Sequence, residues 1–480
     1  MPNILASLSS AGNALDVFEQ ALTVVQNNVD NSSTPGYATQ TLNLEAQPLV
    51  TTGGLTGGVA AQGLQDSRDD YAEEQVQQQT QTLGLYTAQA QATGTIQSFF
   101  DVSGTGGVPA ALNNLLSAFS AWSVTPDDAT AQQTVLSSAQ ALASSINGLA
   151  NSLSSTAQQF DTQIGSTVSQ VDSIATQIQQ YNEQVGQSTT PDPGAEANLY
   201  SALDNLSQLT NFTTVTQSDG TVTVMLGGGT PLVIGDQLNA LSASDAVADN
   251  PPATYPNSPP SAVITDSQGD DVTSQITSGQ LGGLLDTRNQ VLGSLLGNSQ
   301  QQGSLNQFAQ TLADTVNQIL ESGTVSTTAG AASGTALFTY TAGDPTGVAA
   351  SLALNPAITP SQLAPVDSSG NANGNANQLA DLGSTGNTAG SIGGMNLVQF
   401  LAQMSGTVGQ ENQTATTNQA TQQQIAAQAT TLRDQVSGVS LDEQATDVLQ
   451  FQRAYQATAQ VLTVLNDVLD DTMNMMTVTT

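Results

Sequence analysis

Carboxylates are the main side chains in this sequence that could carry acid-base catalysis or bind a hard metal ion. Asp266, Asp270 and Asp271 lie close together in the chain, and many glycosidases cleave glycosidic bonds with a pair of carboxylates. A turn explains the same cluster without catalysis. A calcium loop is a further possibility here or at 367–377, but neither segment has the acidic spacing of an EF-hand loop. We therefore predict no catalytic and no metal-binding residue.

Three residue types on which most enzymes depend are missing. The 480 residues include 39 acidic and only 4 basic side chains, giving a net charge of -35, and lysine, histidine and cysteine do not occur. Their absence excludes Ser-His-Asp and Cys-His catalysis, histidine-ligated metals, disulfides and lysine Schiff bases. The run 227–229 is three glycines after a predicted strand, but it opens no helix, so it is a turn and not a phosphate-binding loop. We predict a protein that is not an enzyme and binds no cofactor.

The acidic composition also limits the partners. Phosphate groups of nucleic acids and anionic membrane surfaces are bound by clusters of lysine and arginine, which this chain lacks. No stretch approaches the ~18 consecutive apolar residues of a membrane span, and the first residues have no positively charged segment typical of a cleaved signal peptide. We expect protein partners, no nucleic acid, no membrane insertion and no cleaved signal peptide.

All four basic residues are arginines, and in so acidic a chain each is expected to form an ion pair. An exposed pair would contribute little to stability, whereas a partly buried pair between domains or subunits would fix their arrangement. Both interpretations remain open for each of them: Arg68, Arg288, Arg433 and Arg453.

The first thirty residues predict a helix that packs on another helix along its length. Apolar residues recur at alternating steps of four and three, the spacing of a coiled-coil seam. The pattern ends at 31–36, where proline and glycine stop the helix. The N-terminal seam consists of Ile4, Leu8, Ala11, Leu15, Phe18, Leu22, Val25 and Val29.

The last forty residues repeat the same design. Val461, Val464 and Val468 widen the apolar stripe, so this helix is expected to contact more than one neighbour. The two seams could pair within one chain or form an assembly surface between subunits, and periodicity alone does not separate these alternatives. The C-terminal seam consists of Val448, Phe451, Tyr455, Thr458, Leu462, Leu465, Leu469, Thr472 and Met476.

Between the ends, apolar periodicity predicts a helical body. Its longest helix runs from 126 to 185, with Thr125 as its N-terminal cap; it is either one rod or bent at Gly148 and Gly165. Further helices are expected at 69–100, 108–122, 196–210, 284–320 and 394–436.

Strand patterns interrupt this body in two places. One hairpin is predicted from 212–216 and 221–226 around an Asp-Gly turn, and a second from 261–265 and 271–273. The segment 337–340 is the one clear strand of a later Gly- and Asn-rich stretch, much of which is expected to be loosely ordered.

The predicted fold is therefore mostly α with inserted β, an elongated multi-domain protein with four units. The terminal helices form a coiled-coil unit, the helical bundle forms the body, a β-rich insert faces outward, and a short Gly/Asn-rich insert follows it. In the same order, the units are 1–45 with 441–480; 46–210 with 276–321 and 391–440; 211–275; and 322–390.

The end of the first helix resembles the N-terminal signature of bacterial flagellar rod, hook and hook-associated proteins. The matching residues are Asn27, Asn28, Asn31, Pro35, Gly36 and Tyr37. The runs 437–444 and 449–462 are similar to the hook-associated protein 1 family, as are 282–288 and 352–356, so the resemblance covers most of the chain outside the inserts. Ser440 and Gln444 depart from the family, which often has Asn and Glu there.

The resemblance implies a structural role at the hook-filament junction. In such proteins the terminal helices form an inner coiled layer, the helical body surrounds it, and copies form a ring at the hook tip. Implied partners are further copies, the hook protein, the second junction protein (hook-associated protein 3), an export chaperone and the type III export apparatus, with a final location outside the cell. The alternatives are a hook or distal-rod protein and, from another class, a secreted carbohydrate-active enzyme or adhesin.

Overall fold

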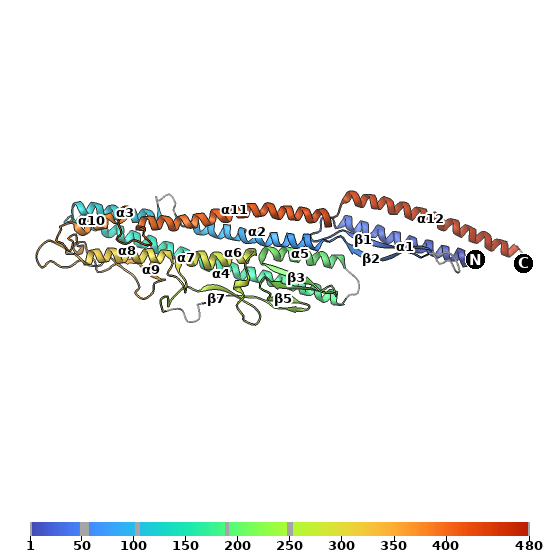
Figure 1. Cartoon of the computed structure of the whole chain (residues 1–480), viewed down its shortest axis with the longest axis horizontal. Coiled ribbons are helices and arrows are strands. Elements are labelled where there is room, and N and C mark those ends of the chain that lie inside the picture. Colours follow the sequence, from blue (N-terminus) through green and yellow to red (C-terminus); the bar gives the residue numbers. More distant parts are fainter. Residues whose placement is uncertain (1, 49–56, 101–105, 188–191, 247–252, 479–480) are drawn as a thin grey trace.

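The computed structural model describes residues 2–48, 57–100, 106–187, 192–246 and 253–478. The molecule is elongated, and both termini lie at the same end of its long axis (Figure 1). A slender unit made from the two ends of the chain continues into a thicker helical body, on whose side the short strands lie. The predicted class, mostly helical with inserted β-structure, is confirmed.

The slender unit pairs the first and last helices. Helix α1 (Pro2–Asp30) packs on α12 (Leu441–Val478), and both ends of the chain are therefore joined within one molecule. An antiparallel hairpin of β1 (Gln40–Gln47) and β2 (Gly58–Asp66) also packs on α1. This hairpin was not predicted, because most of its side chains are exposed and the strands lack the apolar alternation of a half-buried sheet.

Long helices from distant parts of the chain build the body. Helix α2 runs beside α11, and α3, α4 and α8 complete the bundle. The body helices are α2 (Asp70–Gln97), α3 (Gly107–Val124), α4 (Ala129–Gln187), α5 (Pro193–Leu209), α6 (Gly279–Asp286), α7 (Leu292–Leu296), α8 (Ser304–Glu321) and α11 (Leu397–Ser437).

Helix α4 is one continuous rod of 59 residues. Gly148 and Gly165 do not bend it, and a Cβ at either position would meet no neighbouring atom. The predicted cap was wrong: Thr125 ends α3 instead. Asp128 caps α4, because its Oδ1 accepts hydrogen bonds from the N–H groups of Thr130 (2.6 Å) and Ala131 (3.2 Å).

The helix predicted over 284–320 is divided in the structure. A π-helical turn, η2 (Thr287–Val291), separates α6 from α7, and the chain leaves α7 through Gly297. Gly297 and Gly303 have φ values of 95° and 86°, in the left-handed region that favours glycine. Apolar periodicity continues across these breaks, which is why it predicted a single helix.

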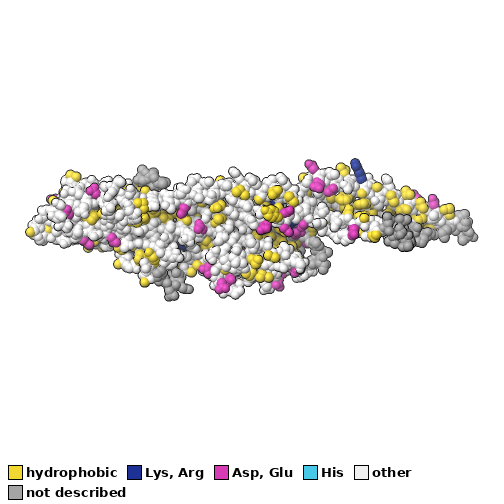
Figure 2. All heavy atoms as spheres, viewed as in Figure 1, with side chains coloured by type: hydrophobic (Ala, Val, Ile, Leu, Met, Phe, Trp, Pro, Cys, Tyr) yellow, Lys and Arg dark blue, Asp and Glu magenta, His cyan; other side chains and the backbone are white. Residues whose placement is uncertain are grey.

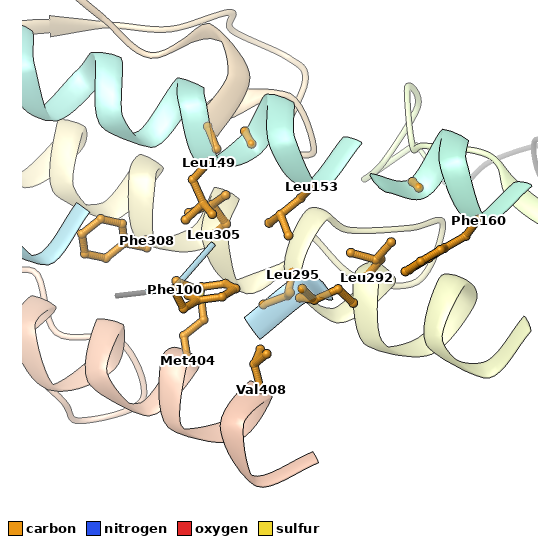
Figure 3. Packing of buried hydrophobic residues seen from close by; sticks show 14 of the residues in the cluster. Phe100, Leu149, Leu153, Phe160, Leu292, Leu295, Leu305, Phe308, Met404 and Val408 are labelled. Carbon is orange, nitrogen blue, oxygen red and sulfur yellow. The ribbon is translucent and has the colours of Figure 1, made fainter. Parts of the chain in front are cut away.

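One continuous hydrophobic core runs along the body. The largest fully buried side chains include Trp122, Phe119 and Phe308. Figure 3 shows part of this core, which includes Leu149 and Leu153 of α4, Leu305 of α8 and Met404 of α11. The core thus joins segments that are far apart in sequence.

The β-rich insert contains two small sheets. The hairpin predicted around Asp219 and Gly220 is confirmed: β3 pairs antiparallel with β4, and the sheet continues in the order β3-β4-β5-β6. Buried Val224 and Val233 add this sheet to the core of the body. The strands are β3 (Phe212–Thr216), β4 (Val222–Leu226), β5 (Pro231–Ile234) and β6 (Gln237–Leu238).

The second predicted hairpin does not form as expected, because its first strand pairs with a different segment of the chain. Strand β8 (Ser261–Thr265) pairs with β7 (Ser242–Ala246) over five residue pairs. The segment 271–273 makes only one bridge, between Thr265 and Asp271, before η1 (Thr273–Gln275) begins. Strand β7, the true partner of β8, was not predicted because its sequence is polar and lacks a strand pattern.

The stretch 322–390 is packed and not loosely ordered as expected. Leu337 and Phe338 are buried in the common core, and β9 covers only Phe338–Thr339 of the predicted strand. Its short elements also contact α3, α4 and α8. They are β9, α9 (Val348–Ser351), β10 (Ala353–Leu354), η3 (Pro360–Gln362), α10 (Gly374–Ala380) and η4 (Asp381–Gly383).

Candidate functional site

The slender unit and the body meet where four chain segments cross, which we call the joint. The joint consists of residues 28–40, 66–73, 196–204 and 433–444. It includes the end of α1, the start of α2, the middle of α5 and the break between α11 and α12.

The side-chain amide of Asn28 ties three of the joint's elements together. Its Nδ2 donates hydrogen bonds to the Gln40 carbonyl (2.8 Å) and to Oε1 of Gln444 (2.9 Å). Its Oδ1 accepts from the Gln40 N–H and from the Tyr37 hydroxyl, both at 2.9 Å. With 1% of its surface exposed, Asn28 thus uses its full hydrogen-bonding capacity to join α1, β1 and α12.

The rest of the signature shapes the turn after α1. Asn31 Nδ2 donates to the Asn27 carbonyl (2.9 Å), and the Thr34 hydroxyl donates to Asn31 Oδ1 (3.1 Å). Gly36 has φ 74°, and a Cβ there would clash with the backbone carbonyl of Ala197 in α5. Only glycine therefore lets this turn lie against the body; Pro35 is exposed.

The break between α11 and α12 is held by hydrogen bonds to its backbone carbonyls. The Ser437 carbonyl accepts from the N–H of Thr39 (2.9 Å) and from the Ser67 hydroxyl (3.1 Å). The Thr39 hydroxyl donates to the Gly438 carbonyl at 2.9 Å. The C-terminal helix is thereby anchored to the segments that precede β1 and α2.

Arg68 is the centre of a buried charge cluster in the joint. Its Nη1 lies 2.8 Å from Glu73 Oε1, and its Nη2 donates to the Gly36 carbonyl at 2.8 Å. Its Nε lies 3.5 Å from Glu196, and its guanidinium stacks 3.6 Å from the centre of the Tyr200 ring. Only 4% of the Arg68 side chain is exposed, so its ion pairs with Glu73 and Glu196 are buried, and its hydrogen bond to the Gly36 carbonyl links them to the turn after α1.

Arg433 extends the cluster from α11. Its Nη1 lies 2.9 Å from Asp204 and 3.5 Å from Glu73. Burial raises the pKa of Glu73 and of Asp204, against the opposite effect of the arginines. Burial, a hydrogen bond with Asp66 and the charge of Asp66 raise the pKa of Glu196 to about 7. The joint therefore holds more acidic than basic groups, and one of them titrates near neutrality.

The other two arginines differ from each other. Arg288 forms a two-point pair with Asp161 of α4, at 2.7 Å and 3.1 Å, and also donates to the Pro260 carbonyl. Arg453 of α12 is exposed, and the described part of the chain gives it no ion-pair partner. The ion pair expected for Arg453 is thus not present within the described molecule.

The predicted N-terminal seam is only partly covered in one molecule. Val25 is buried and Val29 is 41% exposed. Val17 and Ala21 are buried although the seam prediction did not include them. The unpredicted hairpin packs on α1, and Val17 and Val59 of β2 line the same hollow between them. The half-buried seam residues are Ile4, Leu8, Leu15, Phe18 and Leu22.

The predicted C-terminal seam is likewise half-covered. Tyr455 is 38% exposed, and the face of α12 that bears Val461, Val464 and Val468 is exposed. Apolar side chains are visible on the surface of the slender unit in Figure 2. The half-buried seam residues are Val448, Phe451, Leu462, Leu465 and Leu469; the side chain of Met476 lies outside the described residues.

The carboxylates considered for catalysis or calcium binding take part in turns. Asp266 Oδ1 accepts from the N–H groups of Gln268 and Asp270, and Asp367 Oδ1 accepts from those of Ser369 and Asn371. Across the described ranges, no group of three or more acidic side chains is placed to hold a metal ion. No helix within those ranges is both long and apolar enough to cross a membrane.

Sequence reasoning missed most members of the joint. Glu73 lies only five residues after Arg68, but Glu196, Asp204 and Arg433 reach this cluster from segments that are distant in the sequence. Gln444 was noticed only as a departure from a family pattern, and its contact with Asn28 gives that position a structural role.

Comparison with known proteins adds an independent line of evidence. Residues 434–475 match the C-terminal region of the flagellar basal body rod FlgEFG proteins. Residues 93–338, just over half of the chain, match the helical domain of the flagellar hook-associated protein FlgK. The chain belongs to the FlgK family.

Similarity to individual proteins extends along the whole chain. It is 25% identical to flagellar hook-associated protein 1 of Bacillus subtilis (strain 168), over 99% of both chains. It is 24% identical to the protein of that name from Escherichia coli (strain K12), over 97% of this chain and 99% of the other. The solved flagellar hook junction protein FlgK of Burkholderia pseudomallei is 26% identical, with a TM-score of 0.47 over 56% of this chain and 46% of the other.

Proposed function

We propose that this protein is a structural component of the hook-filament junction, which assembles as a ring of copies at the hook tip and gives the filament its attachment site. The observation that carries the proposal is membership of the FlgK family, joined to a slender unit whose terminal helices leave apolar side chains exposed. Such a surface is typical of a protein that binds other proteins.

The proposed partners follow from this position. They are further copies of the chain, the hook protein below, the second junction protein (hook-associated protein 3) above, and, before assembly, an export chaperone and the flagellar type III export apparatus. The unit formed by 1–45 and 441–480 would make the inner contacts, while the insert at 211–275 would face outward. The absence of lysine, histidine and cysteine supports a structural and non-enzymatic role.

Deletion of the gene tests this function. We expect intact hooks, loss of attached filaments and release of unattached flagellin into the medium, with all three restored by the wild-type gene. Normal filaments in the deletion strain would refute the junction role.

A further inference from the structure

Two short links of chain connect the slender unit to the body. One runs from the end of β2 to the start of α2 and the other from the end of α11 to the start of α12; they are residues 67–69 and 438–440. The links lie side by side, because the Ser67 hydroxyl donates a hydrogen bond to the carbonyl of Ser437, which precedes the second link, at 3.1 Å. Two adjacent links of this length form a hinge, about which the slender unit can turn relative to the body.

Two further contacts hold the slender unit against α5, and we call this pair of contacts the latch. In the first, the backbone of Gly36 lies so close to the Ala197 carbonyl that a Cβ would clash with it. In the second, the side chain of Asp66 at the end of β2 forms a hydrogen bond with the side chain of Glu196. Because both contacts are made with the same body helix, they restrain the same rotation about the hinge.

The second contact requires a proton. Two ionised carboxylates only accept hydrogen bonds, so Asp66 and Glu196 can bond only while one of them is protonated. Arg68 does not replace that proton, since its Nη1 binds Glu73 and its Nη2 donates to the Gly36 carbonyl. Its Nε lies 3.9 Å from Asp66 and 3.5 Å from Glu196 and forms a hydrogen bond with neither. Loss of the proton therefore leaves two like charges facing each other with one N–H group between them.

Glu196 can exchange this proton with water. Its side chain is 24% exposed and lines an open hollow of about 410 Å³ between α4, α5 and the turn from β3 to β4. Burial, followed by the hydrogen bond and the charge of Asp66, raises the pKa of Glu196 to about 7. The proton is therefore gained and lost close to neutral pH.

Other groups around Glu196 do not act on the contact in the same way. Burial raises the pKa of Glu73 and of Asp204, but both belong to the body and already have an arginine nitrogen at 2.8 Å and 2.9 Å. Burial also raises the pKa of Tyr181 and of Tyr200, away from neutrality. The charged and titratable groups around Glu196 and its neighbours are Asp66 of β2, Arg68 of the first link, Asp70 and Glu73 of α2, Tyr181 of α4, Asp192, Tyr200 and Asp204 of α5, Asp219 of the turn from β3 to β4, and Arg433 of α11.

We propose that the joint is a proton-dependent latch. While Asp66 and Glu196 share a proton, the slender unit is held against α5; when the proton leaves to water through the hollow, the two carboxylates repel and the slender unit turns away about the hinge. The inference concerns the shape of a single molecule, so it goes beyond the proposed function and does not depend on it.

The size of the effect follows from the pKa of Glu196. It is about 7 in the latched molecule, against an ordinary value of 4.5 for a carboxyl group that has left the contact. The latched state holds the proton more tightly, so its advantage is complete below pH 4.5 and is lost as the pH rises through 7. Between pH 6 and pH 8, the ratio of latched to open molecules should fall by up to about tenfold.

The distance between two spin labels measures the position of the slender unit. Since the chain has no cysteine, Ser33→Cys in the turn after α1 and Gln208→Cys in α5 provide two labelling sites, both at exposed positions. Double electron-electron resonance on the full-length protein should give one short distance at pH 6 and a growing population at longer distance at pH 8. A distance distribution that is the same at both pH values, or that shifts in the opposite direction, would overturn the proposal.

Substitutions in the labelled protein separate the latch from a merely structural contact. The amide introduced by Glu196→Gln or by Asp66→Asn donates to the remaining carboxylate without a titrating proton, so each variant should keep the short distance at both pH values. The matched control is Asp434→Asn, which removes a carboxylate of the joint that is 61% exposed and pairs with Arg433; it should respond to pH as the wild type does. A pH response that survives in Glu196→Gln, or one that disappears in Asp434→Asn, would exclude the latch.

Discussion

Replacing Asn28 by alanine should open the joint. The amide makes four hydrogen bonds, two of them to the backbone of Gln40, which is 6% exposed. Without the amide, the Gln40 N–H and carbonyl become unpaired in a buried place, whereas Tyr37 is half-buried and can reach water. At about 1–3 kcal/mol for each of these two unsatisfied buried groups, the local cost is roughly 2–6 kcal/mol.

Hydrogen exchange measures this cost where it occurs. Local opening of β1 and of the start of α12 should become at least about thirtyfold more frequent, at 1.4 kcal/mol per tenfold. Exchange in α4, far along the core, should be unchanged. The matched control is Asn27→Ala, because Asn27 is exposed and accepts through its backbone carbonyl, which alanine retains. Equal exchange at Gln40 in the wild type and in Asn28→Ala would refute the reasoning.

Three further predictions concern the joint and the seams. Gly36→Ala should lower the melting temperature of the slender unit, because its φ of 74° and its contact with α5 exclude a Cβ; a melting temperature equal to that of the wild type would contradict this. Leu22→Asp and Leu462→Asp should leave the circular dichroism of the body intact but prevent filament attachment, and normal motility in both would exclude an assembly role for the seams. The pKa of Glu196 is about 7 in the folded protein, against an ordinary value of 4.5, so the folded state holds this proton more tightly than the unfolded state. The resulting stabilisation is fully present below pH 4.5 and is lost as the pH rises through 7. The joint should therefore be roughly 1 kcal/mol less stable at pH 8 than at pH 6, a difference that thermal unfolding should no longer show in Glu196→Gln.

The long helices could be predicted from the sequence because their apolar residues repeat over many turns. The apolar residues that recur along α4 from Val135 to Ile178 lie on its buried side. Their spacing in the sequence was therefore sufficient to predict the helix. The hairpin of β1 and β2 could not be found in this way, since few of its side chains are buried and its strands show no alternation.

The joint could be predicted only in part, for a different reason. The signature from Asn27 to Tyr37 identified one of its four segments, and Asn28 within it has the contacts expected of a structural residue. Some partners of Arg68 and Arg433 are near them in the sequence, such as Asp66 and Asp434. The partners from α5, Glu196 and Asp204, are distant from both arginines in the sequence, so only the packing of the body reveals them.

The placement of the arginines has a consequence for resistance to proteolysis. Trypsin-like proteases cut after lysine or arginine, and this chain has no lysine. Arg68, Arg288 and Arg433 are held in ion pairs, with 4%, 8% and 17% of their side chains exposed, which shelters the adjoining bonds from such enzymes. The folded molecule therefore presents one accessible cleavage point for such enzymes, after the exposed Arg453.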